Sequence, residues 1–265
     1  MRLRVLALVG LLAGCASGGD AGVQHAPDVG TTFPVARSPR PVVVIGDLVQ
    51  VVGGLRGEDK VDVLAGRLDF TGQHADAPPA APVTLPDGAQ ATLPLIGSAD
   101  ALSALTRPRT TTTPSTPPSK LVAVEFGTAE FPTDRGPWTA PAWLFTTEAG
   151  SVLAWPAPEP GAFWRPGEVR PAVTTGEAST NDRELVVSMP SAPSPCPGDE
   201  PARNEAVVRE SADTVTVGVR TVGHVGECAR TLAVTTQPYR VRLADPLGGR
   251  LLVDQDGGVV AVTTR

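Results

Sequence analysis

Few side chains in this sequence have the types and spacing of a catalytic site. The three histidines are His25, His74 and His224, and none lies in a His-Glu-x-x-His motif. A serine nucleophile would need a Gly-x-Ser-x-Gly turn or a Ser-x-x-Lys motif, and neither occurs. Two carboxylates can act together in glycoside hydrolysis, and Glu125 and Glu130 are candidates for such a pair. The sequence therefore favours a non-enzymatic protein, with a carboxylate hydrolase as the alternative.

Candidate metal ligands are equally sparse. His74 and Asp76 could supply half of a metal site, but a solvated loop explains them without a ligand. Asp254 and Asp256 resemble the start of a calcium-binding loop, yet the third acidic ligand and the distant Glu are absent. We therefore expect a hairpin turn there, and no metal or organic cofactor.

Cys15 ends the first hydrophobic segment. Arg2 and Arg4 precede the apolar run of residues 5–12, which is shorter than the roughly 20 residues that a helix needs to cross a bilayer. This arrangement is typical of a signal peptide, here residues 1–14. The motif Leu-Ala-Gly-Cys at 12–15 resembles the lipobox of bacterial lipoproteins, in which the cysteine receives diacylglycerol and the chain is cut before it. We expect Cys15 to be acylated; the alternative is an ordinary signal peptide with a chance cysteine.

The other two cysteines are Cys196 and Cys228. Two thiols in an oxidising compartment most simply form one disulfide. Closing a loop of about 32 residues would stabilise the fold by roughly 3.5 to 4 kcal/mol in the chain-entropy model. The alternative is a reactive or metal-binding pair, but no charged neighbour, CxxC motif or paired histidine supports it.

All four tryptophans lie between Trp138 and Trp164. Exposed rings at Trp138 and Trp143 could form a binding surface for carbohydrate or for a protein partner. In a chain with few aromatic residues, large rings more often fill the core, and this alternative stays open.

The spacing of hydrophobic and turn residues predicts a mainly β protein, with two antiparallel β-rich halves and one short helix. Residues 15–40 are expected to form a flexible tether, because they combine small polar residues with prolines. The N-terminal half spans 41–157, with strands at 42–52 and 60–70 and a Thr/Pro-rich loop at 106–119 that permits O-glycosylation. A helix begins at Ser98 as its N-cap.

The C-terminal half spans 165–265. Residues 214–217 alternate strictly between polar and apolar, as a strand with one buried face does, and a further strand is expected at 230–235. The chain carries 28 acidic and 22 basic side chains, a net charge of −6, and no basic patch. It therefore has no feature of a nucleic-acid-binding protein.

The order of these segments resembles a group of functionally uncharacterised actinobacterial lipoproteins. The segments that carry the likeness are 41–54, 92–102, 133–145, the Cys196 to Cys228 region and 241–254. Relatives often have another cysteine pair before the strand at Leu121, which this chain lacks. The resemblance implies a lipid anchor and a bridged C-terminal half, and it implies no activity.

These observations lead to one main expectation and one alternative. We expect a lipid-anchored protein on the extracytoplasmic face of the cell membrane, which binds a cell-wall component or a secreted protein. The alternative is an envelope hydrolase acting on peptidoglycan or glycan through a carboxylate pair. A solute-binding protein of a transporter fits poorly, because it needs two α/β lobes.

Overall fold

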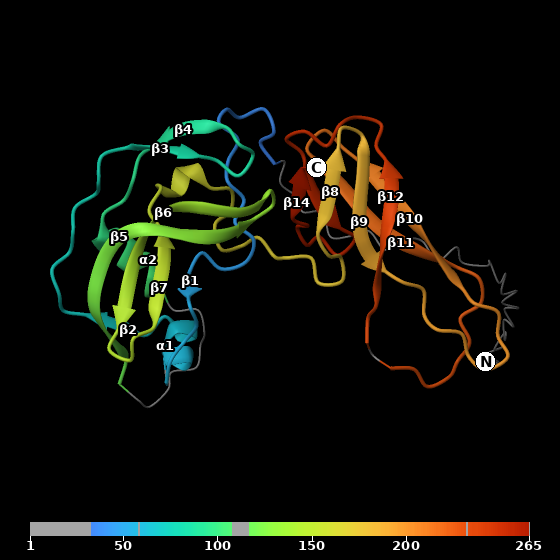
Figure 1. Cartoon of the computed structure of the whole chain (residues 1–265), viewed down its shortest axis with the longest axis horizontal. Coiled ribbons are helices and arrows are strands. Elements are labelled where there is room, and N and C mark those ends of the chain that lie inside the picture. Colours follow the sequence, from blue (N-terminus) through green and yellow to red (C-terminus); the bar gives the residue numbers. More distant parts are fainter. Residues whose placement is uncertain (1–32, 58, 108–116, 232, 265) are drawn as a thin grey trace, which may run out of the picture.

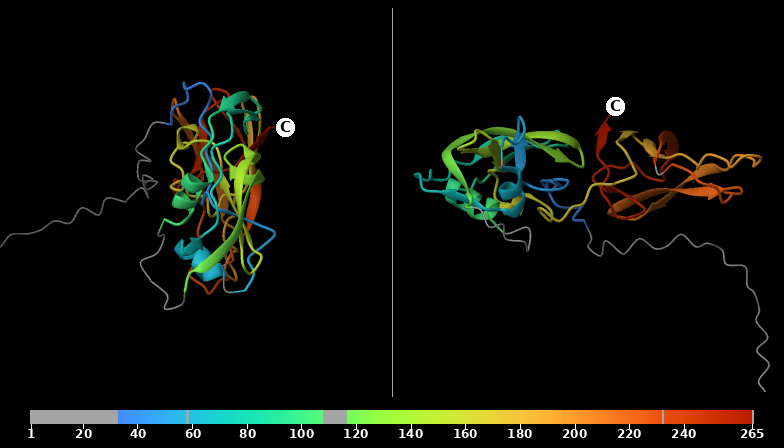
Figure 2. Two further views of the ribbon diagram at one scale, coloured as in Figure 1. Left: turned by 90° about the vertical axis from the view of Figure 1, so that its left-hand side faces the viewer. Right: turned by 90° about the horizontal axis from the view of Figure 1, so that it is seen from below.

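The computed structural model describes residues 33–57, 59–107, 117–231 and 233–264, and these form two β-rich halves side by side (Figures 1 and 2). Strands β1 to β7 belong to the N-terminal half and β8 to β14 to the C-terminal half. The expected mainly β fold with two β-rich halves is therefore confirmed. Among the described residues no helix is long and apolar enough to cross a membrane.

The N-terminal half is built on a five-stranded sheet in the order β1-β7-β6-β5-β2. Its bounds are β1 Gln50–Val52, β2 Leu68–Phe70, β5 Ser119–Thr133, β6 Gly136–Thr147 and β7 Val152–Pro156. A separate hairpin of β3 Ala81–Thr84 and β4 Gln90–Leu93 covers part of it. The long β5–β6 hairpin is the central element, and its tip is formed by Asp134 and Arg135.

The two faces of the β5–β6 hairpin pack into two separate apolar clusters. Because side chains alternate along a strand, Val124 and Phe145 lie on one face and Phe131 and Trp138 on the other. The first face packs near helix α2 (Ser98–Leu105) in one apolar cluster, and the second face packs against the β3–β4 hairpin in another. The first face is thus left open to solvent near the hairpin tip.

Residues 60–70 differ from the expected strand. Helix α1 occupies Asp59–Ala65, and only Leu68–Phe70 form a strand, β2, which runs parallel to β5. Acidic side chains in the first turn favour this helix, and Gly66 ends it in the left-handed conformation with φ 71°. The described residues therefore contain two α-helices instead of one, besides a 3-10 turn at Pro160–Ala162.

Helix α2 is confirmed at the expected place, but its cap differs. Gly97 is the N-cap, and the hydroxyl of Ser98 instead exchanges hydrogen bonds with the backbone of Ala75, at 2.8 Å from its N–H and 3.2 Å from its carbonyl oxygen. Ser98 therefore fastens the preceding loop to the helix.

The C-terminal half consists of two sheets around one apolar cluster, with strand orders β10-β11-β13 and β12-β9-β8-β14. The bounds are β8 Ala178–Asn181, β9 Glu184–Pro190, β10 Arg203–Glu210, β11 Thr214–Val222, β12 Thr236–Arg242, β13 Leu251–Asp254 and β14 Val262–Thr264. Two pairs, β11 with β13 and β14 with β8, are parallel, so this half is not wholly antiparallel. The described part of 230–235 is not a strand, because pairing with β9 begins at Thr236.

Candidate functional site

The site residues predicted from the sequence have three different outcomes. Cys15 lies outside the described residues. The disulfide between Cys196 and Cys228 is present, with Cα atoms 5.9 Å apart, and joins the loop before β10 to the loop after β11. Trp138 and Trp143 are buried, at 3 % and 1 % exposure, so the possible binding surface on these rings is wrong and the core alternative, which the scarcity of aromatic residues favoured, holds.

Both tryptophans are core residues for a structural reason. The indole N–H of Trp138 donates to the carbonyl oxygen of Thr84 at 2.8 Å, and that of Trp143 donates to Ile96 at 2.9 Å. Each ring therefore fills a core and satisfies its polar atom inside the protein.

The suspected metal ligands are not gathered into a site. His74 packs edge-on against Phe70, and its Nδ1 lies 3.4 Å from the hydroxyl of Ser98. Asp254 accepts hydrogen bonds from the backbone N–H groups of Asp256, at 3.0 Å, and Gly258, at 2.8 Å, as expected for a turn. Within the described ranges no group of three or more His, Cys, Asp or Glu could hold a metal ion.

A buried ionic network, made by Arg40, Asp134 and Arg135, joins the two halves. Asp134 is 1 % exposed and accepts hydrogen bonds from both Arg40 Nη atoms. Arg40 Nε also donates to the carbonyl oxygen of Gly249 at 3.0 Å, and Arg135 Nη2 donates to Gly248 and Arg250 at 2.7 Å each. The tip of the β5–β6 hairpin is thus fixed to the turn before β13.

An apolar cluster completes this interface. Phe33 and Val43, from before β1, pack with Val169 and with Leu251 and Val259 of the C-terminal half. The Arg40 guanidinium lies 4.6 Å from the centre of the Phe33 ring. The last part of the expected tether, from Phe33 to Arg40, is therefore attached to the fold at both ends: Phe33 supplies the ring and Arg40 the cation of the interface, while residues 36–39 between them are exposed.

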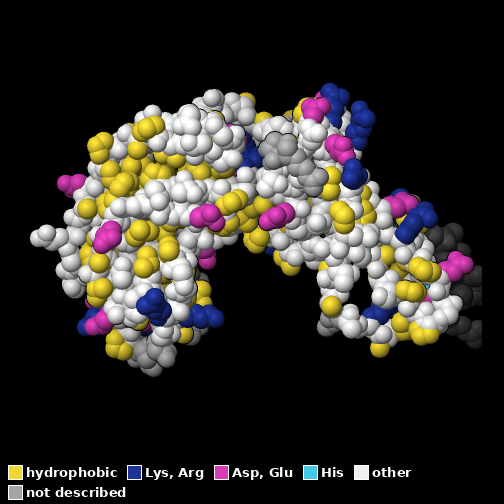
Figure 3. Space-filling model, viewed as in Figure 1, with side chains coloured by type: hydrophobic (Ala, Val, Ile, Leu, Met, Phe, Trp, Pro, Cys, Tyr) yellow, Lys and Arg dark blue, Asp and Glu magenta, His cyan; other side chains and the backbone are white. Residues whose placement is uncertain are grey.

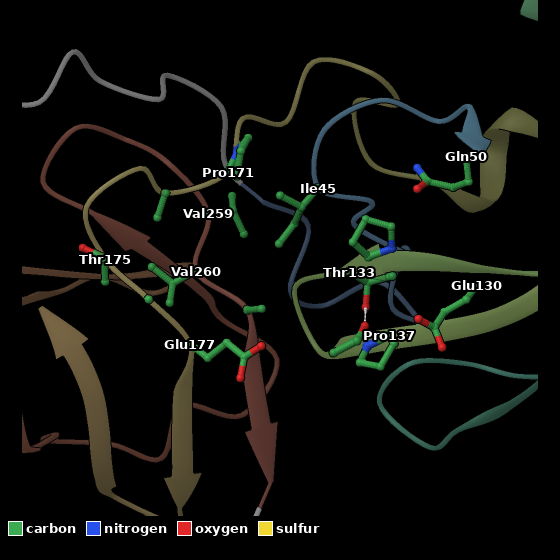
Figure 4. A pocket seen from close by; sticks show the side chains of 15 residues that line it. Ile45, Gln50, Glu130, Thr133, Pro137, Pro171, Thr175, Glu177, Val259 and Val260 are labelled. Carbon is green, nitrogen blue, oxygen red and sulfur yellow. Dashed lines mark hydrogen bonds between the residues drawn. The ribbon is translucent and has the colours of Figure 1, made fainter. Parts of the chain in front are cut away.

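A groove of about 670 Å³ lies where the two halves meet (Figure 4). One wall is the solvent-facing end of the β5–β6 hairpin, and the other is the segment 171–177 with residues 259–261. The lining residues are Ile45, Gln50, Glu130, Pro132, Thr133, Gly136, Pro137, Pro171, Ala172, Thr175, Gly176, Glu177, Val259, Val260 and Ala261. The groove is therefore mostly aliphatic and proline-rich, with a few polar side chains at its edges.

Glu130 and Glu177 give the groove its charge. They come from opposite walls, and in the close-up the side chains of Thr133 and Pro137 lie between them (Figure 4). Both side chains are exposed, and neither makes an ion pair or a side-chain hydrogen bond with any residue that the structure describes. In the space-filling view, acidic side chains lie on either side of a small hydrophobic patch at this junction (Figure 3).

The turn that follows β13 supports one wall of the groove. Burial raises the pKa of Asp254 above its ordinary value, while backbone N–H groups, including that of Gly258, act in the opposite direction. Val259 directly follows Gly258 in the chain, and its carbonyl oxygen accepts a hydrogen bond from the N–H of Ala172 at 3.0 Å. The two segments that form this wall are therefore linked to each other.

The carboxylate pair proposed from the sequence is only half present in the groove. Glu130 lines it, whereas Glu125 is exposed elsewhere on β5. Glu177 takes the second place, and no motif marked it in the sequence. Both glutamates are exposed, so each carboxylate is accessible to a charged ligand. The arrangement suits charge recognition better than proton transfer.

Comparison with protein-family models, curated proteins and solved structures finds no match for this chain. The resemblance to actinobacterial lipoproteins therefore stays a prediction.

Proposed function

We propose that this chain is a lipid-anchored protein on the extracytoplasmic face of the cell membrane, whose body is a non-enzymatic binding module of the cell envelope. The groove between the two halves is its ligand site. The observation that carries this proposal is the pair of unpartnered carboxylates, Glu130 and Glu177, on opposite walls of a proline-rich groove. The sequence motif ending at Cys15 supports the anchor.

Blocking the groove tests the ligand site independently of charge. Pro137 is exposed, lies on β6 and faces the groove, so Pro137→Trp would narrow it. Val122 is 59 % exposed and does not line the groove, so Val122→Trp is a control of equal size. We expect Pro137→Trp, and not Val122→Trp, to lose the envelope component that the full chain retains in a pulldown. Equal retention by both variants would overturn the proposed site.

The anchor has its own test. Cys15→Ser should move the protein from the membrane fraction to the soluble fraction, and mass spectrometry should find an acyl glycerol on Cys15 of the unaltered chain. A mature product that retains Met1 and carries no lipid would contradict the proposed location.

A hydrolase acting on peptidoglycan or glycan remains the second candidate, because Glu130 and Glu177 do face a common groove. It predicts release of reducing ends from purified peptidoglycan, and loss of that activity in Glu130→Gln or Glu177→Gln. Binding without turnover would favour the non-enzymatic function.

A further inference from the structure

We propose that the groove binds an extended, basic peptide segment whose Lys or Arg side chains pair with Glu130 and Glu177. This inference rests on the proposed function, because it names the ligand class of the same groove. The ligand would be part of a secreted or envelope protein, recognised by its charge and its extended shape.

The groove carries negative charge that its own lining does not balance. None of the lining residues is Lys or Arg, so nothing in the described lining neutralises the two carboxylates. Elsewhere, acidic side chains such as Asp134, Glu205 and Glu210 do form ion pairs with arginines of this chain. Each carboxylate, having no ion-pair partner in the described chain, can accept a charged hydrogen bond from a cationic ligand. The net charge of −6 also favours the approach of a cationic ligand.

The accessible part of the remaining lining is aliphatic. Ile45 is half-buried and the three lining prolines are exposed, so these side chains offer aliphatic contacts along the groove. No Trp, Tyr or Phe lines it, and sugar-binding sites commonly rely on such rings. The methylene stems of Lys and Arg fit an aliphatic lining with a carboxylate at its end.

The two walls of the groove are held in place by buried contacts. The groove walls are joined by the buried network of Arg40, Asp134 and Arg135 and by the shared apolar cluster around Phe33. A groove that already has its shape loses little conformational entropy when a ligand enters. Two exposed carboxylates on such walls can therefore recognise a peptide without a change of fold.

The test measures binding of fluorescein-labelled (Lys-Ala)5 and (Glu-Ala)5 peptides to the full chain in detergent, by fluorescence polarisation at low and high salt. We expect the first peptide to bind and the second not to bind. Glu130→Gln and Glu177→Gln should each weaken binding roughly three- to tenfold, and high salt should weaken it further. Glu125→Gln removes the same charge from the same strand outside the groove, and should leave the affinity unchanged.

Three outcomes would overturn the inference. The first is equal peptide affinity of the double variant Glu130→Gln/Glu177→Gln and the unaltered chain. The second is a loss of affinity in Glu125→Gln as large as that in the groove variants, which would indicate attraction by net charge alone. The third is binding of a neutral glycan probe, chitotetraose, with no binding of (Lys-Ala)5. If Pro137→Trp abolished binding of chitotetraose, the proposed function would stand while the peptide ligand failed.

Discussion

Replacing Asp134 with Asn tests whether the ionic network locks the two halves together. The substitution keeps the shape of the side chain and removes its charge. The backbone hydrogen bonds of residue 134, from its N–H to Val43 and to its carbonyl oxygen from Val262, are unaffected. Any loss of stability therefore reports on the carboxylate and its two arginine partners.

The expected loss follows from burial. The side chains of Arg40 and Arg135 are each 10 % exposed, so Asp134→Asn leaves two cations near one another with little access to water. Burial already lowers the pKa of Arg135, and the Asp134 carboxylate opposes that effect. Removing one partner of a buried pair costs about 3–5 kcal/mol. We expect about 3 kcal/mol, the lower end of that range, because the amide oxygen can still accept a hydrogen bond from Arg40.

Urea unfolding gives the measurement. All four tryptophans precede β8 and report on the N-terminal side of the chain, whereas far-UV circular dichroism reports on both halves. In the unaltered chain we expect the two probes to show the same unfolding midpoint in urea. In Asp134→Asn we expect both midpoints to fall to lower urea concentrations and to differ from one another, because the halves separate before both have unfolded. The control is Glu184→Gln, because the ion pair of Glu184 with Arg240 is exposed and should contribute less than about 1 kcal/mol.

A loss in Asp134→Asn no larger than that of the control would refute this reasoning. So would transitions that remain coincident while the free energy of unfolding falls, because the halves would then be coupled by contacts other than the network.

Three further substitutions probe single features of the fold. Removing the disulfide with Cys196→Ser/Cys228→Ser should lower the free energy of unfolding by about 4 kcal/mol, since the bridge spans 32 positions, and urea unfolding would show it. Burial alone would raise the pKa of Asp59, but hydrogen bonds from hydroxyl groups, the first from Thr147 at 2.6 Å, lower it below its ordinary value. The ionised carboxylate therefore stabilises the fold when the pH is above the ordinary pKa of Asp, and this stabilisation is lost as the pH falls. Thr147→Val should therefore cost about 1–3 kcal/mol at pH 7 and less at pH 3 in thermal unfolding. The raised pKa of Asp254 means that its charge disfavours folding at neutral pH. Asp254→Asn keeps the acceptor oxygen, so this variant should melt at the same or a higher temperature than the unaltered chain at pH 7. The difference in melting temperature should become smaller as the pH falls.

The β-rich architecture could be predicted from local pattern, because alternating and β-branched runs such as 214–217 favour strands. Residues 60–70 show the limit of that reasoning. Their alternating apolar residues also fit a helix whose buried Asp59 and Asp62 meet hydroxyl groups from β6 and β5, and those partners are distant in the chain. Contacts with residues distant in the chain therefore favour a helix over a strand in this segment.

The candidate site could be predicted only in part for the same reason. Glu130 was recognisable as a carboxylate on a strand, but its counterpart Glu177 lies in the other half, and only the folded chain brings them to one groove. Asp134 and Arg135 are typical turn residues in sequence, and nothing local shows that they would be buried against Arg40. Composition favoured burial of Trp138 and Trp143, but only the folded chain shows that they fill two different clusters on opposite faces of one long hairpin.

The most direct test of the groove as the binding surface is hydrogen exchange along the full chain, with and without the (Lys-Ala)5 peptide. We predict slower exchange in residues 130–137 and 171–177, the segments that form its two walls. Unchanged exchange in both segments, with slowing confined to another surface such as 181–184 and 240–242, would contradict the account.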